Sequence, residues 1–68
     1  MQKQGQTILT GKKMITAYMG RSWRVIQKWI DERHFPARKI DGVWESDMEL
    51  IIDWRKKEIQ RQLKKTWN

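Results

Sequence analysis

The sequence predicts a small, mostly α-helical domain with one β-hairpin, in the order helix, turn, helix, hairpin, helix. Three observations support this prediction. Apolar residues recur every three or four positions in three separate stretches, which is the spacing of one helical face. A glycine-containing turn separates the first two stretches. The dipeptide Asp41-Gly42 lies between two short β-prone runs, and this is the strongest local signal for a hairpin.

Length, charge and composition limit the classes of function. The chain has 68 residues and a formal net charge of +7. One core in a chain this short supplies only about 3–5 kcal/mol of stability. So large a positive charge favours a polyanionic partner such as nucleic acid. The sequence has no cysteine and one histidine, so we expect no disulfide, no metal site and no cofactor.

The first helix is predicted over residues 11–19, after a polar tail of residues 1–6. Thr10 is the expected N-cap, and Ile8 or Leu9 would form a hydrophobic staple before it. Gly20 is expected to end the helix in a left-handed conformation. The predicted apolar stripe consists of Met14, Ile15, Tyr18 and Met19.

The second helix is predicted from an N-cap at Ser22 to Arg33, and Pro36 cannot continue it. Its inner face would carry Ile26, Trp29 and Ile30, with Phe35 as a core residue under the following turn. Its outer face carries Arg24, Gln27, Lys28 and Asp31. Asp31 and its neighbour Glu32 point apart on a helix, and we expect them to pair with nearby basic side chains.

The hairpin is predicted to have strands at about residues 37–40 and 43–46. Alternation places Ile40 and Trp44 in candidate core positions, while Arg38 or Lys39 projects from the first strand. Trp29, Trp44 and Trp54 are expected in the core. For Trp23, packing, stacking on a ligand and contact with a partner remain equally open.

A third helix is predicted to start at a capping box formed by Ser46 and Glu49. Its first part, Met48 to Trp54, is apolar on most sides and is expected to pack within the domain. The domain is therefore placed at residues 7–56, with a basic helical extension at 57–68. That extension is expected to be solvated, to contact phosphates or to form a dimer seam through Ile59, Leu63 and Trp67.

The order of elements and several residues resemble a known family. The pattern covers about residues 8–54 and resembles the winged helix-turn-helix domains of the MerR-like and excisionase-like superfamily, in its AlpA-type branch. The stretch from Gly20 to Pro36 is also similar to the DNA-binding domain of lambda-type phage terminase small subunits. The residues that carry the resemblance are Tyr18, Met19, Gly20, Ser22, Ile26, Trp29, Ile30, Phe35, Pro36, Ala37, Arg38, Lys39, Ile40, Asp41, Gly42 and Trp44.

The resemblance implies that the second helix enters the DNA major groove and that the hairpin is a wing. It also matches Lys12 to a basic position early in the first helix. Two residues depart from the pattern: Asp41 puts an acid at the wing tip, and Trp23 stands where a polar or basic residue is common. The expected DNA-binding residues are Lys12, Arg21, Ser22, Trp23, Arg24, Gln27, Lys28, Arg38, Lys39 and Gly42.

We therefore expect sequence-specific binding of double-stranded DNA by a regulatory or excisionase-like protein of a phage or mobile element. The alternatives are DNA recognition for packaging and a protein-interaction module that uses Trp23 and the stripe on the third helix. RNA binding is disfavoured because no aromatic sheet platform is evident. No nucleophile–base pair or glycine-rich phosphate loop is present, so we expect neither an enzyme nor a small-molecule ligand. Without an apolar stretch of membrane-spanning length, a cytoplasmic location is expected.

Overall fold

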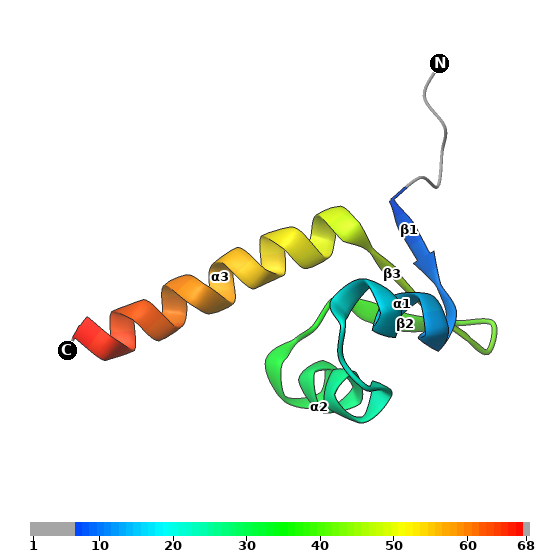
Figure 1. The fold of residues 1–68 in the computed structure, drawn as a ribbon, viewed down its shortest axis with the longest axis horizontal. Helices are drawn as coiled ribbons and strands as arrows, with labels where there is room; N and C mark the ends of the chain where they lie inside the picture. The colour runs from blue at the N-terminus through cyan, green and yellow to red at the C-terminus, as the bar shows by residue number, and fades with distance from the viewer. Residues whose placement is uncertain (1–6, 68) are drawn as a thin grey trace, which may run out of the picture.

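The computed structural model describes residues 7–67, with side chains described as far as residue 63. The backbone is mostly helical and carries one small antiparallel sheet, which confirms the mostly α prediction (Figure 1). The predicted tail, residues 1–6, lies outside the described residues. In chain order the elements are β1 (Ile8–Thr10), α1 (Gly11–Met19), α2 (Trp23–Arg33), β2 (Ala37–Ile40), β3 (Val43–Asp47) and α3 (Met48–Trp67).

The sheet has three strands, one more than the predicted hairpin supplies. β1 pairs antiparallel with β3, with Leu9 opposite Ser46, and the strand order is β1-β3-β2. The sequence pattern did not indicate β1, because three residues are too few to show the alternation of a strand. Leu9, one of the two residues expected in a staple before α1, is a buried residue of this strand, and Ile8 is exposed.

The hairpin confirms the predicted strand positions and corrects one core residue. Asp41 and Gly42 both have left-handed φ angles, 51° and 82°, as a two-residue type I′ turn requires. This turn pairs Ile40 with Val43, so these two side chains share one face of the sheet and Trp44 lies on the other. Trp44 packs against the core, whereas Ile40 is exposed. The prediction that Ile40 is a core residue is wrong.

The core lies between the inner face of the sheet and the three helices. Most of the tryptophans surround it as partly buried side chains, which confirms the core positions predicted for Trp29, Trp44 and Trp54. The position of Phe35 is also confirmed, since it contacts Trp54 edge-on at a centroid separation of 5.0 Å. The buried residues are Leu9, Ile15, Ile26, Phe35 and Ile51.

The inner face of α1 is narrower than the sequence predicts. Ile15 is fully buried and Met19 packs against the core. Met14 and Tyr18, in contrast, are exposed. Each of them is one residue, or about 100° of helical turn, away from the buried line. The prediction that these two residues face the core is therefore wrong.

One of the two helix ends described next differs from the prediction, and the other confirms it. Thr10 occupies the N-cap position of α1, but its side chain accepts no capping hydrogen bond. α2 ends at Arg33, as predicted, and His34 after it takes a left-handed conformation with φ 59°. The backbone N–H of His34 donates to the carbonyl of Trp29, an arrangement typical of helix C-termini.

The start of α3 is capped by Asp47 and not by the predicted Ser46–Glu49 box. The Asp47 carboxylate accepts from the backbone N–H of Glu49 at 2.9 Å and of Leu50 at 3.3 Å. The Ser46 hydroxyl instead donates to the carbonyl of Pro36 at 2.6 Å. The capping box is therefore wrong by one residue.

Asp47 also joins the N-terminal strand to α3. The Thr7 hydroxyl donates to its carboxylate at 2.9 Å, and the Met48 N–H donates to the Thr7 carbonyl at 2.8 Å. The hydrogen bond from Thr7 lowers the pKa of Asp47 below its ordinary value, and the capping N–H groups act in the same direction against partial desolvation.

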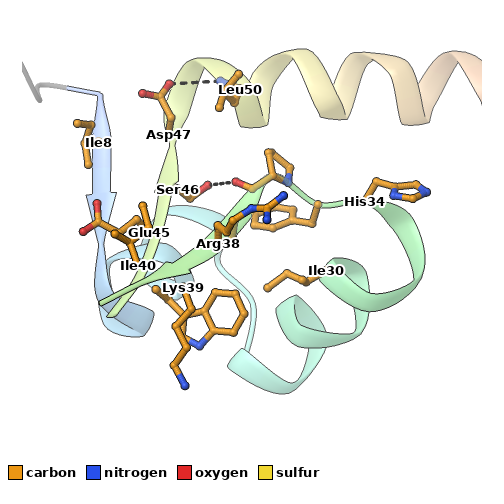
Figure 2. A pocket seen from close by; sticks show the side chains of 14 residues that line it. Ile8, Ile30, His34, Arg38, Lys39, Ile40, Glu45, Ser46, Asp47 and Leu50 are labelled. Atoms are coloured by element: carbon orange, nitrogen blue, oxygen red, sulfur yellow. Dashed lines mark hydrogen bonds between the residues drawn. The ribbon is translucent and has the colours of Figure 1, made fainter. Parts of the chain in front are cut away.

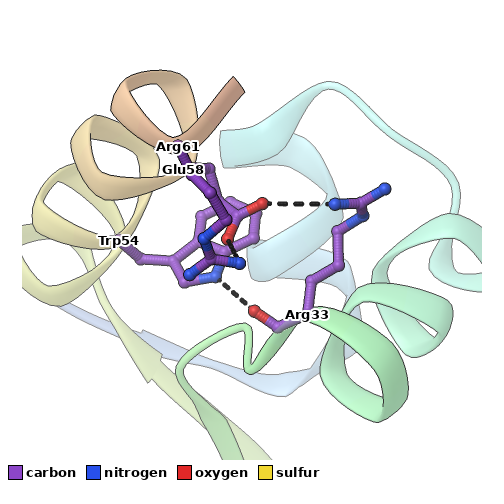
Figure 3. Close-up of polar contacts among 4 residues, drawn as sticks. All are labelled: Arg33, Trp54, Glu58 and Arg61. Atoms are coloured by element: carbon purple, nitrogen blue, oxygen red, sulfur yellow. Dashed lines mark hydrogen bonds and ion pairs between the residues drawn. The ribbon is translucent and has the colours of Figure 1, made fainter. Parts of the chain in front are cut away.

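α3 is anchored on the C-terminus of α2 (Figure 3). The Trp54 indole N–H donates to the Arg33 carbonyl at 2.8 Å. One turn later Glu58 pairs with Arg33 at 3.4 Å and with Arg61 at 3.0 Å, and its side chain is only 13% exposed. The contact with the domain thus extends into the stretch that the sequence assigns to a separate extension.

Only one side of the first half of α3 packs against the domain. Ile51 is buried, and Met48 and Trp54 border the core. Leu50 and Ile52 are exposed, so the expected packing of this segment within the domain is confirmed for one of its sides only. Within the part of the chain that the structure describes, no helix has the length and apolar character needed to cross a membrane.

Candidate nucleic-acid interface

The turn between α1 and α2 fixes the direction of α2. Gly20 ends α1 with φ 69°, and its N–H donates to the Thr16 carbonyl at 2.8 Å. Two residues later Ser22 begins α2: its hydroxyl oxygen accepts from the Val25 N–H at 3.4 Å. Both roles were predicted and are confirmed. Since the Ser22 oxygen serves the cap, its hydroxyl hydrogen is the part of the side chain that can reach a phosphate.

The turn before α2 and the outer face of α2 present cations that have no ion-pair partner within the described part of the chain. Arg21, Arg24 and Lys28 are exposed. Among the described residues, ion pairs involve Arg33, Lys57 and Arg61, and none of these is on the outer face of α2. The charges on this face are therefore free to bind an external anion.

Gln27 lies on the same face and is held by a neighbour. Its side-chain N–H donates to the Asp31 carboxylate one turn later at 3.3 Å. The partner of Asp31 is thus an amide and not the basic side chain that was expected. This bond uses one of the two N–H groups of Gln27 and leaves the other, together with the carbonyl oxygen, available.

Trp23 lies at the start of α2 and contacts two other elements. Its ring packs against Trp44 of β3 at a centroid separation of 5.3 Å and a tilt of 56°. The Nζ of Lys12, from α1, lies 5.4 Å from the centroid of the ring, within the range of a cation–π interaction. Of the three roles left open for Trp23, packing is therefore shown. Its remaining exposed surface still faces the turn.

The two basic residues of the hairpin point in different directions. In the sheet Lys39 is paired with Trp44 and Arg38 with Glu45, so the two basic side chains lie on opposite faces. Figure 2 shows them leaving β2 in different directions. Lys39 is on the face of Trp44, the residue that packs against Trp23, whereas Arg38 is on the outer face with Ile40. The two are therefore not equivalent parts of a single contact.

The structure brings part of the predicted set together. A shallow depression of about 640 Å³ lies over the turn, and Lys12, Arg21, Ser22 and Trp23 line it. Lys13 lines it too. It was missed because only its neighbour Lys12 matches the family pattern, although two consecutive lysines at a helix start were a visible signal. Lys39 is linked to this group through Trp44, while Arg38 is not.

A second concave region surrounds β2, and it is open and chemically mixed (Figure 2). It has a volume of about 750 Å³, and both apolar side chains such as Ile8 and Ile30 and charged ones such as Arg38 and Glu45 line it. No three histidine, cysteine, aspartate or glutamate side chains within the described residues come together as a metal site.

Comparisons of the chain with protein-family models, with curated proteins and with solved structures gave no match.

Proposed function

We propose that the chain binds double-stranded DNA in a sequence-specific way, with the outer face of α2 in the major groove. The observation that carries this proposal is the set of exposed cations on α2 that lack acidic partners, on a helix that a turn and a cap hold in place. The net charge of +7 supports it, since phosphate neutralisation supplies much of the affinity for DNA.

The residues of the interface divide into two groups by chemistry. Lys12, Lys13 and Arg21, around the turn, are suited to phosphates, which fix the position of the protein on the duplex. Arg24 and Gln27 are suited to base edges: an arginine pairs with guanine O6 and N7, and a glutamine pairs with adenine N6 and N7. The free N–H and carbonyl of Gln27 are the two groups that an adenine contact requires.

The wing has a smaller role in this proposal. Lys39 lies on the face nearer α2 and is suited to a phosphate beside the groove. Asp41 at the tip repels the DNA backbone, and Gly42 serves the turn. The wing therefore contacts DNA through the strand and not through the tip, and Arg38 contributes little because it lies on the opposite face.

The resemblance of the sequence supports a role in a phage or mobile element, as a transcription regulator, as an excisionase-like factor or in marking DNA for packaging. A domain this small covers few base pairs, so cooperative binding to repeated sites would raise its specificity. Selection of bound sequences from a random duplex pool would identify the site, and the number of copies of that site would give the number of protein chains.

The proposal is tested by fluorescence anisotropy with a labelled duplex at increasing salt. We expect log K to fall linearly with log salt concentration. On the selected site, Arg24→Ala should cost about 1–3 kcal/mol and relax the sequence preference. Lys57→Ala is the matched control, because it removes the same charge from α3. A flat salt dependence, or equal effects of the two variants on sequence preference, would contradict the proposal.

A second candidate function is a protein-interaction module. The specific observation in its favour is that Ile59 and Leu63 on α3 are exposed large apolar residues. The side chain of Trp67, the third member of the predicted seam, lies outside the described side chains.

A further inference from the structure

One side of α3 carries an apolar stripe that no other element covers. The side chains of Ile52, Ile59 and Leu63 are 48%, 53% and 52% exposed. Together with Lys56 they fall within about 60° of arc at a helical turn of about 100° per residue. The spacing of four and seven residues is that of the anchors by which amphipathic helices bind grooves and other helices.

The stripe continues onto α1. A groove of about 420 Å³ lies where the C-terminal end of α1 meets α3, and Tyr18, Met19, Ile52, Arg55 and Lys56 line most of it. Tyr18 is itself exposed. The uncovered surface is therefore an apolar strip with a hollow at one end, and cations lie in it and beside it.

The charges around this apolar surface indicate the chemistry of the molecule that would bind to it. Residues 55–65 contain six lysines and arginines and one glutamate. That glutamate, Glu58, is on the other side of the helix and is already paired with Arg33 and Arg61. Asp53, just before this stretch, is paired with Lys57. Arg55 and Lys56 have no ion-pair partner within the described residues and border the apolar side chains directly.

Two other occupants fit this surface less well. A second copy of the chain would bring Lys56 and Arg55 against an equally basic helix, and like charges at such an interface are costly. A DNA duplex would satisfy the cations, but its phosphates would leave Ile59 and Leu63 without an apolar partner. An acidic helix with one apolar face satisfies both the cations and the apolar side chains.

We propose that the Ile52–Ile59–Leu63 side of α3 binds an acidic amphipathic helix of another protein. Apolar residues of that helix cover the stripe, and its carboxylates pair with Arg55 and Lys56. This surface is on α3, on the side away from its contact with α2, so binding does not depend on the proposed DNA interface.

The probes are two synthetic peptides of equal length with the same leucine stripe, one with glutamates and the other with lysines at the flanking positions. Calorimetry with the full chain should show one-to-one binding of the glutamate peptide and binding of the lysine peptide that is weaker by about tenfold or more. Backbone amide shifts of the labelled chain should change along residues 52–63. Equal affinity for the two peptides, or no binding of either, would overturn the proposal.

Variants of the chain test the surface itself. Leu63→Gln should weaken binding of the glutamate peptide about tenfold or more, since a leucine that the peptide would bury is lost, and Lys56→Glu should reduce the preference for the glutamate peptide over the lysine peptide. Leu50→Gln is the matched control: Leu50 is 58% exposed on the same helix, but about 160° away from Ile52. Circular dichroism verifies that each variant is folded. An equal loss with Leu50→Gln would overturn the proposal.

Two further outcomes would assign the strip to another occupant. If the free chain self-associates in sedimentation and Leu63→Gln abolishes this, the occupant is a second copy. If Leu63→Gln weakens binding to duplex DNA, the strip faces the DNA. Because the peptide experiments contain no DNA, their failure leaves the proposed DNA-binding function standing, and failure of DNA binding does not affect them.

Discussion

Trp54 contacts three parts of the molecule, so its replacement should lower the free energy of unfolding of the whole domain. The indole N–H donates to the Arg33 carbonyl at 2.8 Å, which ties α3 to the end of α2. The ring also contacts Phe35 at 5.0 Å and Trp29 at 5.6 Å between centroids. Trp54→Phe removes the hydrogen bond and part of the ring contacts, and Trp54→Ala removes all of them.

The expected magnitudes follow from these contacts. A hydrogen bond of this kind contributes about 0.5–1.5 kcal/mol, and an aromatic pair contributes about 0.5–1.5 kcal/mol beyond its buried area. Because Phe keeps part of the ring contacts, we expect Trp54→Phe to lower the free energy of unfolding by about 1–2 kcal/mol. Truncation of a core tryptophan to alanine costs about 3–5 kcal/mol, which equals the whole stability expected of a core this small.

Far-ultraviolet circular dichroism during heating and during urea titration measures both variants. For a domain of this size, each kcal/mol changes Tm by about 4–8 °C. Trp54→Phe should thus melt roughly 5–15 °C below the unchanged chain, and Trp54→Ala should be largely unfolded at 25 °C. If Trp54→Ala stays folded and melts only a few degrees lower, the connection between α2 and α3 is not what stabilises the domain.

Three further predictions concern the caps and turns. Ser22→Ala should lower the free energy of unfolding by about 1 kcal/mol, because the capping hydrogen bond is lost. Thr10→Ala, at a cap position without a side-chain hydrogen bond, should change the free energy of unfolding little. Equal urea midpoints for the two variants would contradict this prediction. Gly20→Ala should cost about 1–2 kcal/mol, because an L-residue is strained at φ 69° even though the added methyl group meets no atom; an unchanged Tm would show that the turn relaxes. The pKa of Asp47 is lowered in the folded chain, so its contribution to stability is present above its unfolded pKa and is lost as the pH falls through the folded one. Below about pH 4 the unchanged chain should therefore lose stability more steeply than Asp47→Asn or Thr7→Val, and parallel acid-melting curves would refute the assignment.

Local chemistry determined the parts of the fold that could be predicted. Gly20 and Ser22 mark a helix end and a helix start because left-handed backbone and free N–H groups limit which residues are tolerated there. Asp41 and Gly42 mark a two-residue turn for the same kind of reason. These signals require only neighbouring residues, and the structure has each of them at the predicted position.

Some of the errors concern contacts between parts of the chain that are distant in the sequence. Nothing local shows that Leu9 pairs with Ser46, thirty-seven residues later, and the Ser46 hydroxyl bonds to Pro36 and not to a helix start. Ile40 was placed on the wrong face because counting alternate residues across the turn ignores that the turn itself pairs Ile40 with Val43.

In the candidate interface, too, the sequence predicts the chemistry of the side chains better than it predicts their contacts. The chemistry of Arg24, Gln27 and Lys28 is visible from the helical spacing alone. Their local partners, such as Asp31 for Gln27, depend on side-chain conformations. Arg38 and Lys39 lie on opposite faces because successive residues of a strand alternate. The pairing of β2 with β3 shows which of them, Lys39, shares the face of Trp44.

The pairing of β1 with β3 has a consequence for the order of folding. α1, α2 and the hairpin can each form from neighbouring residues, but the contact between Thr7 and Asp47 spans 40 positions. Closing such a loop has an entropic cost that must be met before the contact is gained. We therefore expect the N-terminal strand to join the sheet after the local elements have formed, when its first residue reaches the residue that begins the last helix.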